Sequence, residues 1–351
     1  AGRNPQVDKM SEDSETGEEQ ESSVSQTYLM DEDLRETREL AEALLGEVEK
    51  VVMGKRPVLE LVMTGILAGG NILFEDNPGL AKTLLANTFA EGLGCDFKRV
   101  QFTPDLLPAD ITGIYIFDRK QNEFDFRPGP LFCNILLADE INRAPPKTQA
   151  ALLEAMQEKP ITIEGTTHIL ERPFIVLATQ NPIEYEGTYP LPEAQMDRFL
   201  VRLSVGYPDE EVEASILAAR AERKHDGFEV ESIASPAEVV AMHRAVEEVF
   251  VKHEIMQYMV SLVQGTRGDP RVAVGSSPRG SLGLFKLSRA LALLSGRDYV
   301  VPDDVKRSVI PVLAHRIILK PEARIRGVKP EQVLAELLTT VDVPAVKVED
   351  E

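Results

Sequence analysis

Short apolar runs recur along the first two thirds of the chain, and segments with helical spacing separate them. Each run is nearly continuous in hydrophobic residues, whereas a strand with one solvent-exposed face alternates apolar and polar residues. Continuous apolar strands between helices are typical of a parallel sheet that helices cover on both faces. We therefore predict five core strands, at residues 71–75, 97–102, 135–139, 174–180 and 199–205.

Two stretches within this rhythm alternate apolar and polar residues around a turn. Residues 113–126 alternate around a polar turn at 120–122, and residues 161–170 do the same around Glu164 and Gly165. Two alternating segments joined by a short polar turn predict a β-hairpin. Hairpins that project from an α/β core are candidates for contacts with another molecule.

Helical spacing dominates both ends of the folded chain. A first helix is predicted from Asp31, with apolar residues repeating behind an acidic first turn. Beyond residue 208 the strand pattern stops. Ser235 and Ser277 each precede a proline, a cap followed by proline at the first helical position. Further helices are predicted at residues 210–224, 254–265, 303–314 and 330–340.

These patterns divide the chain into four parts. Residues 1–30 are acidic and polar, and they have too little apolar surface to offset the entropy of ordering, so we expect a disordered tail. Residues 31–206 form the predicted αβα core, residues 207–341 an all-helical second domain, and residues 342–351 a C-terminal tail.

Charge and composition narrow the classes of function. The chain has 58 acidic and 38 basic residues, a formal net charge of −20 that disfavours binding to a phosphate backbone. Its two cysteines form no CxxC pair, so neither a disulfide framework nor a zinc site is indicated. The longest apolar stretch, residues 58–74, is interrupted by polar residues and glycines, which is poor for a membrane span. We expect a cytoplasmic protein.

A candidate phosphate loop follows the first predicted strand. Residues 74–83 run from an apolar strand into a helix, the context in which loop amides and a helix N-terminus converge on phosphates. Lys82 would neutralise the phosphates of ATP, and the Thr83 hydroxyl would coordinate Mg²⁺. Asp76 and Ala81 stand where the strict pattern has glycines, so a strand-to-helix turn with an exposed lysine is the alternative. The candidate ATP-binding residues here are Asn77, Pro78, Gly79, Leu80, Ala81, Lys82, Thr83 and Leu84.

Two acids end the third predicted strand. A carboxylate at Asp139 is suited to hold Mg²⁺, and one at Glu140 is suited to orient or deprotonate an attacking water. Alternatively the two acids simply start a helix. Asn181, at the end of the fourth strand, would reach the water or the γ-phosphate, unless it is only a turn residue before Pro182. All three elements sit at carboxyl ends of strands, where open α/β sheets bind ligands.

The chain resembles the MoxR family of AAA+ ATPases over about residues 31–340. Five separated motifs occur in the family's order, at residues 101–113, 140–144, 178–182, 191–199 and 277–279. The resemblance implies a parallel sheet of strand order 5-1-4-3-2 with hairpin insertions and a helical lid. It also implies a homo-oligomeric ring, expected to be a hexamer, that hydrolyses ATP with Mg²⁺.

Further residue roles come from the resemblance. Arg198 corresponds to the arginine finger that enters the neighbouring subunit's site, and Arg279 to the second sensor in the lid. Val52 and Met53 fall where this class packs adenine. The alternatives are a structural Asp197–Arg198 pair, a capping-region arginine and a helix-ending turn. His315 and Arg316 suggest no partner and are assigned to structure alone.

The resemblance also suggests a function. It implies chaperone-like protein remodelling or metal-cofactor insertion, with a von Willebrand factor A domain protein as a partner and a client that the sequence does not identify. The two hairpins resemble insertions that line a ring's pore or face. The turn of the first hairpin, residues 118–123, interleaves no aromatic residue with its basic ones, which favours a protein client over nucleic acid. A nucleic-acid motor and a nucleotide-dependent scaffold with little turnover are the alternatives.

Overall fold

The computed structural model describes residues 32–344 except 78, 121, 159 and 182–186. The predicted acidic tail, most of the predicted C-terminal tail and Pro78 of the phosphate loop lie outside these residues. Among the described residues, no helix combines the length and the apolar content that crossing a bilayer requires.

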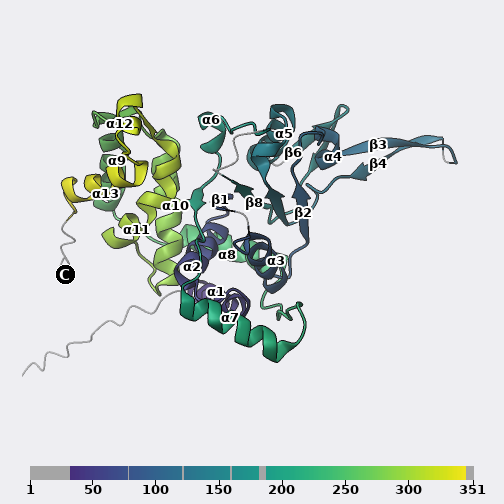
Figure 1. The fold of residues 1–351 in the computed structure, drawn as a ribbon, viewed down its shortest axis with the longest axis horizontal. Helices are drawn as coiled ribbons and strands as arrows, with labels where there is room; N and C mark the ends of the chain where they lie inside the picture. The colour runs from purple at the N-terminus through teal and green to yellow at the C-terminus, as the bar shows by residue number, and fades with distance from the viewer. Residues whose placement is uncertain (1–31, 78, 121, 159, 182–186, 345–351) are drawn as a thin grey trace, which may run out of the picture.

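A five-stranded parallel sheet forms the centre of the first half of the chain (Figure 1). Its spatial order is β2, β5, β8, β1, β9, which in chain order of the core strands is the predicted 5-1-4-3-2. The strands are β1 (Ile72–Glu75), β2 (Phe97–Gln101), β5 (Ile135–Asp139), β8 (Ile175–Gln180) and β9 (Val201–Leu203). All five predicted strands are therefore confirmed, each within a few residues of its expected bounds.

Both faces of this sheet are covered, which explains the continuous apolar runs. Phe74, Leu137 and Leu177 belong to one cluster with helices on one face, while Leu136 and Val176 belong to a second cluster on the other. The first face packs against α1 (Glu32–Val51), α2 (Arg56–Leu67) and α3 (Lys82–Gly92). The second packs against α5 (Pro146–Glu158), and the short helices α4 (Pro108–Thr112), η1 (Ile141–Arg143) and α6 (Glu193–Met196) complete the core.

Both predicted hairpins are present. β3 (Gly113–Asp118) pairs with β4 (Glu123–Pro128), and β6 (Pro160–Ile163) pairs with β7 (Thr166–Ile169), all antiparallel. The β3–β4 hairpin projects far from the body of the molecule (Figure 1). At its base the ring of Phe126 stacks on His168 of β7, with ring centroids 4.0 Å apart. The two hairpins therefore support each other where they leave the core.

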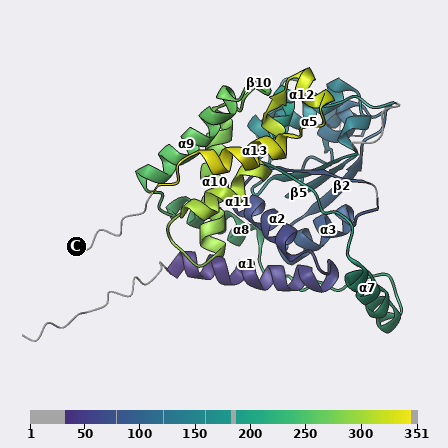
Figure 2. The same cartoon turned by 60° about the vertical axis from the view of Figure 1, so that its left-hand side comes forward.

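Helices dominate the rest of the chain. They are α7 (Glu210–Arg223), α8 (Pro236–Glu248), α9 (His253–Gly268), α10 (Pro278–Leu294), α11 (Pro302–Leu313), η2 (Ala314–Arg316), α12 (Pro321–Ile325) and α13 (Pro330–Thr340). Ser235 and Glu238 form the reciprocal capping box that their spacing suggests, with Pro236 at the first position of α8. α8 packs along α1, and α9, α10 and α11 form the bundle beside the core (Figure 2).

The helical domain differs from the all-helical expectation in one detail. β10 (Val272–Val274) and β11 (Ile318–Leu319) form a short antiparallel ladder at one end of the bundle. Val272 and Leu319 are buried there, so pairing satisfies backbone groups that the packing removes from water. Segments of two and three residues carry no periodicity, so the sequence pattern gives no sign of this ladder.

Candidate nucleotide site

A cavity of about 400 Å³ opens at the carboxyl edge of the sheet. It brings together the three elements that the sequence singled out: the loop after β1, the end of β5 and the end of β8. The residues that line it are Gly79, Leu80, Ala81, Lys82, Thr83, Leu84, Arg99, Asp139, Glu140, Thr179, Gln180 and Asn181.

The loop after β1 turns sharply into α3. Gly79 has a φ of 83°, and Ala81, the residue that precedes the helix, has a φ of 54°. Ala81 offers no side-chain cap, so the first-turn amides of α3 are left for another acceptor. Because these amides and the positive end of the helix dipole border the cavity, this edge is suited to an anion such as a phosphate.

Asp76 explains one departure from the strict glycine pattern. Its side chain is buried and accepts hydrogen bonds from Ser204 Oγ at 2.6 Å and from the Val205 amide at 2.5 Å. These bonds tie the start of the loop to the chain leaving β9. A glycine has no side chain and would make neither bond, so these two hydrogen bonds are what the aspartate adds to the loop.

Lys82 is the first residue of α3, and its side chain extends back to the preceding loop. Its Nζ donates to the carbonyl oxygens of Asp76 at 2.9 Å and Asn77 at 3.1 Å. Burial lowers the pKa of Lys82, and the carboxylates of Asp76, Asp139 and Glu140 oppose that shift. The ammonium group therefore lies partly desolvated beside the cavity, where an added phosphate would interact strongly with it.

Asp139 is held by two neighbours at the end of β5. Its Oδ1 accepts from Thr179 Oγ1 at 2.6 Å, and its Oδ2 accepts from Arg99 Nη2 at 2.7 Å. Thr83 lines the same cavity, so a hydroxyl and a carboxylate face one space. Oxygen ligands of this kind are those that a hard divalent cation prefers, and the donor set fits Mg²⁺.

Glu140 follows Asp139 in an uncommon backbone conformation. Its φ is 56°, in the left-handed region, and its amide donates to Thr179 Oγ1 at 2.8 Å. Its carboxylate accepts from Gln101 Nε2 at 2.7 Å and pairs with Arg143 at 3.2 Å. A residue stays in this conformation only where its contacts hold it there, as the bonds to Thr179 and Gln101 do here. In this position Glu140 lines the cavity.

The remaining lining residues include one prediction and three omissions. Asn181 is buried and lines the cavity at the end of β8, as its position in the sequence suggests. Arg99, Thr179 and Gln180 also line it, although none of them was predicted to have a role there. Arg99 alternates with Gln101 along β2, and this pair of polar residues on one side of a core strand is the signal that would have found it.

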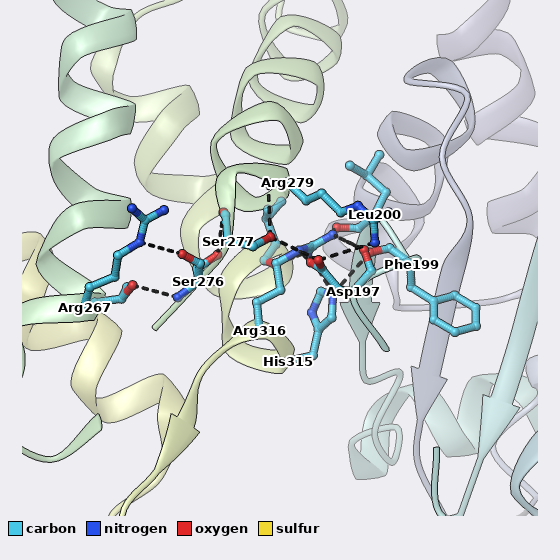
Figure 3. A network of polar contacts seen from close by, with 11 residues as sticks. Asp197, Phe199, Leu200, Arg267, Ser276, Ser277, Arg279, His315 and Arg316 are labelled. Carbon is cyan, nitrogen blue, oxygen red and sulfur yellow. Dashed lines mark hydrogen bonds and ion pairs between the residues drawn. The ribbon is translucent and has the colours of Figure 1, made fainter. Parts of the chain in front are cut away.

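Five of the predicted site residues that the structure describes do not line this cavity: Val52, Met53, Asn77, Arg198 and Arg279. Asn77 lies in the loop before α3, where its carbonyl accepts from Lys82 Nζ. Val52 is buried in the core cluster, and neither it nor Met53 borders the space beside the phosphate loop. Arg198 and Arg279 instead line a second cavity of about 330 Å³. Arg198 Nε is buried and has no hydrogen-bond partner among the described residues, so this donor is unused within that part of the chain. At this cavity Arg279 Nη1 lies 3.6 Å from Asp197 Oδ2 (Figure 3).

Comparisons with known proteins agree with this architecture. Residues 71–201 match the family described as ATPase family associated with various cellular activities (AAA), and residues 264–337 match the AAA lid domain. A putative ATPase from Cytophaga hutchinsonii has a solved structure that superimposes with a TM-score of 0.84 at 40% sequence identity, covering 90% of this chain and 98% of that one.

Relatives over most of the chain give the narrower family. The uncharacterized protein YeaC of Bacillus subtilis is 48% identical, over 86% of this chain and 95% of its own length. Chaperone MoxR1 of Mycobacterium tuberculosis is 43% identical, over 87% of this chain and 82% of its own length. With this identity, the matched core and lid and the phosphate-loop cavity, the chain belongs to the MoxR family of AAA+ ATPases.

Proposed function

We propose that this ATPase binds ATP with Mg²⁺ at the phosphate-loop cavity and hydrolyses it at a site shared between neighbouring subunits of a homo-oligomeric ring, expected to be a hexamer. One observation carries the proposal: Arg198 and Arg279 lie together on a second cavity, away from the phosphate loop of their own chain. Two guanidinium groups placed away from their own phosphate loop are suited to a phosphate on another subunit.

The chemistry follows from the residues that line the first cavity. The first-turn amides of α3 and Lys82 would hold the phosphates, and Glu140 would orient and deprotonate the attacking water. Asn181 lies beside them, suited to hydrogen-bond the same water. Thr83 and Asp139 would hold Mg²⁺, which supplies charge neutralisation of the phosphates.

The arginine pair would complete the site from the next subunit. Charge that develops on the transferring phosphoryl group is stabilised by preorganised donors, and a guanidinium offers several in a fixed fork. The unused Arg198 Nε is such a donor. If Arg198 acts on the neighbouring subunit's nucleotide, hydrolysis depends on assembly. Lid motion in one subunit would then change the hydrolysis rate in its neighbour.

The output that we propose is chaperone-like remodelling of a client protein in the cytoplasm, or insertion of a metal cofactor, with a von Willebrand factor A domain protein as partner. The relative from M. tuberculosis is named a chaperone, which supports this class. The projecting β3–β4 hairpin exposes Phe117 and Phe124, whose ring centroids lie 5.3 Å apart. Exposed aromatic rings on an acidic chain suit an apolar protein segment better than nucleic acid.

The Arg198→Ala variant tests the shared site. Its own phosphate loop is intact, so its affinity for a fluorescent ATP analogue should stay near that of the unmodified protein. Its steady-state turnover should fall by a factor on the order of a hundred or more, because the transition state loses a charged donor. Parallel losses of affinity and turnover would instead place Arg198 in the fold or in its own subunit's pocket.

A further inference from the structure

Arg316 connects the lid to the segment that carries Arg198, although its sequence context suggests no partner. It ends η2, directly after α11, and its side chain is only 4% exposed. Figure 3 shows its guanidinium reaching from the lid to the chain between α6 and β9. A buried guanidinium requires partners for its donors, and the contacts that satisfy it show what it holds in place.

Val312 and His315 are the partners of Arg316 within the lid, and its partners outside the lid lie on both sides of Arg198. Arg316 Nε donates to Asp197 Oδ1 at 2.8 Å, and Nη2 donates to the Phe199 carbonyl at 2.6 Å. Nη1 donates to the Leu200 carbonyl at 3.0 Å. Because the guanidinium is planar and its donors have fixed directions, these bonds set the course of the backbone immediately before and after Arg198.

Asp197 continues the connection to the start of α10. Its second oxygen, Oδ2, accepts from Ser277 Oγ at 3.0 Å and lies 3.6 Å from Arg279 Nη1 (Figure 3). Ser277 is the residue that caps α10, and Arg279 is in the first turn of that helix. One carboxylate therefore touches Arg316, the α10 cap and Arg279.

Neighbouring bonds hold this end of α10 against α9. The Ser276 amide donates to Thr266 Oγ1 at 3.0 Å, and the Ser276 carbonyl accepts from Arg267 Nε at 2.9 Å. The start of α10 is thus fixed within the lid, and the chain around Arg198 is fixed to it through Asp197 and Arg316. A displacement of the lid would displace both arginines together.

We propose that Arg316 is a positioning residue that holds Arg198 and Arg279 as one unit, with the Asp197 carboxylate as the bridge between them. The proposal rests on the shared site proposed above, since the unit presents both guanidinium groups to the neighbouring subunit's γ-phosphate. Arg316 also borders the second cavity, but its guanidinium is buried and its donors are engaged within its own chain, so the role proposed for it is to position the two arginines rather than to contact the phosphate. It fixes the direction from which the two arginines approach, and small errors of direction weaken transition-state contacts strongly.

A double-mutant cycle on turnover tests this role. In the otherwise unmodified ring, Arg316→Gln should lower kcat by about tenfold or more while the affinity for a fluorescent ATP analogue changes by less than about twofold. In the Arg198→Ala background the same substitution should lower kcat by a smaller factor, about threefold or less, because Arg279 is then the only one of the two positioned groups that remains. Arg316→Lys should behave like Arg316→Gln, since an ammonium group cannot replace the fork.

Arg297→Gln is the matched control. It breaks a comparable pair, in which Arg297 donates to both oxygens of the buried Asp304 at 2.7 Å, but both residues lie in the lid and neither touches Asp197. Its effect on kcat should be small and equal in the two backgrounds. If Arg316→Gln fails to fold, Asp197→Asn provides the same cycle, because it removes the bridging charge and keeps the side chain's shape.

The outcomes separate this proposal from the shared site. Equal losses of kcat for Arg316→Gln in both backgrounds, or a matching pattern for Arg297→Gln, would overturn the positioning role and leave the shared site intact. Normal turnover of the Arg198→Ala ring would overturn the shared site itself, and a loss in Arg316→Gln beside it would then show that Arg316 does not act through Arg198.

Discussion

At the residue scale, the cavity beside α3 concentrates opposite charges around one lysine. Lys82 bonds only to loop carbonyls in the described structure, while three carboxylates surround it at a greater distance. Lys82→Ala should therefore lower the affinity for ATP by about a hundredfold or more, because it removes the cation opposite the phosphates. Equilibrium titration with a fluorescent analogue measures this. An affinity close to that of the unmodified protein would remove the phosphate-loop assignment.

Glu140 tests the chemical step separately from binding. Glu140→Gln keeps the shape and the contact with Gln101, so ATP should bind with nearly unchanged affinity. Hydrolysis should slow by a factor of at least about a hundred, because an amide cannot accept the proton. Phosphate release in a single turnover is the measurement, with binding checked in the same sample. Unchanged release would assign the base to another residue.

The sequence predicted the residues that line the first cavity better than it predicted the contacts that support Arg198 and Arg279 at the second. Lys82, Asp139 and Asn181 follow strand ends, so their convergence follows from the topology alone. The distant partners of Arg316, which are Asp197, Phe199 and Leu200, lie more than a hundred positions earlier in the chain, and no local pattern predicts such a pairing. Arg279 was expected to be the second sensor in the lid, and only the folded chain places it with Arg198.

At the scale of elements, the β3–β4 hairpin carries exposed aromatic surface away from the nucleotide. Phe117→Ser with Phe124→Ser should reduce protection of an aggregating test protein, reduced insulin, because the proposed client contact is apolar. Basal ATP hydrolysis should stay within about twofold, since exposed substitutions away from the site cost little. Light scattering and phosphate release measure the two effects.

A control separates this contact from exposed hydrophobicity in general. Ile325, on α12, is 86% exposed and lies in the lid. Ile325→Ser should leave protection unchanged. Equal loss of protection in both variants, or none in the hairpin variant, would contradict a client contact at the hairpin.

Element boundaries followed from periodicity where the elements were long. The twenty residues of α1 bury a stripe that includes Leu44, Leu45 and Val48, and this stripe is visible in the sequence. β10 and β11 were not predicted, because their pairing depends on tertiary contacts rather than on spacing. Periodicity therefore located the sheet and its covering helices, and long-range packing decided the rest.

At the scale of the whole molecule, the proposed turnover requires a site that a second subunit completes. The described chain supplies the phosphate loop on one cavity and Arg198 with Arg279 on another. In the proposed ring, the second group of one subunit would lie against the first group of the next, and a closed ring would use every site. Nucleotide affinity should then depend on the subunit that supplies the phosphate loop. Turnover should depend on that subunit and on the neighbour that supplies Arg198.

Mixing two inactive variants tests this claim most directly. Lys82→Ala subunits lack a working phosphate loop and Arg198→Ala subunits lack the finger, so neither ring alone should turn over ATP at more than about a hundredth of the normal rate. Native mass spectrometry first confirms that the subunits exchange. With a shared site the mixture should regain activity, because an intact loop then faces an intact Arg198. Exchange without any recovery would contradict the shared site.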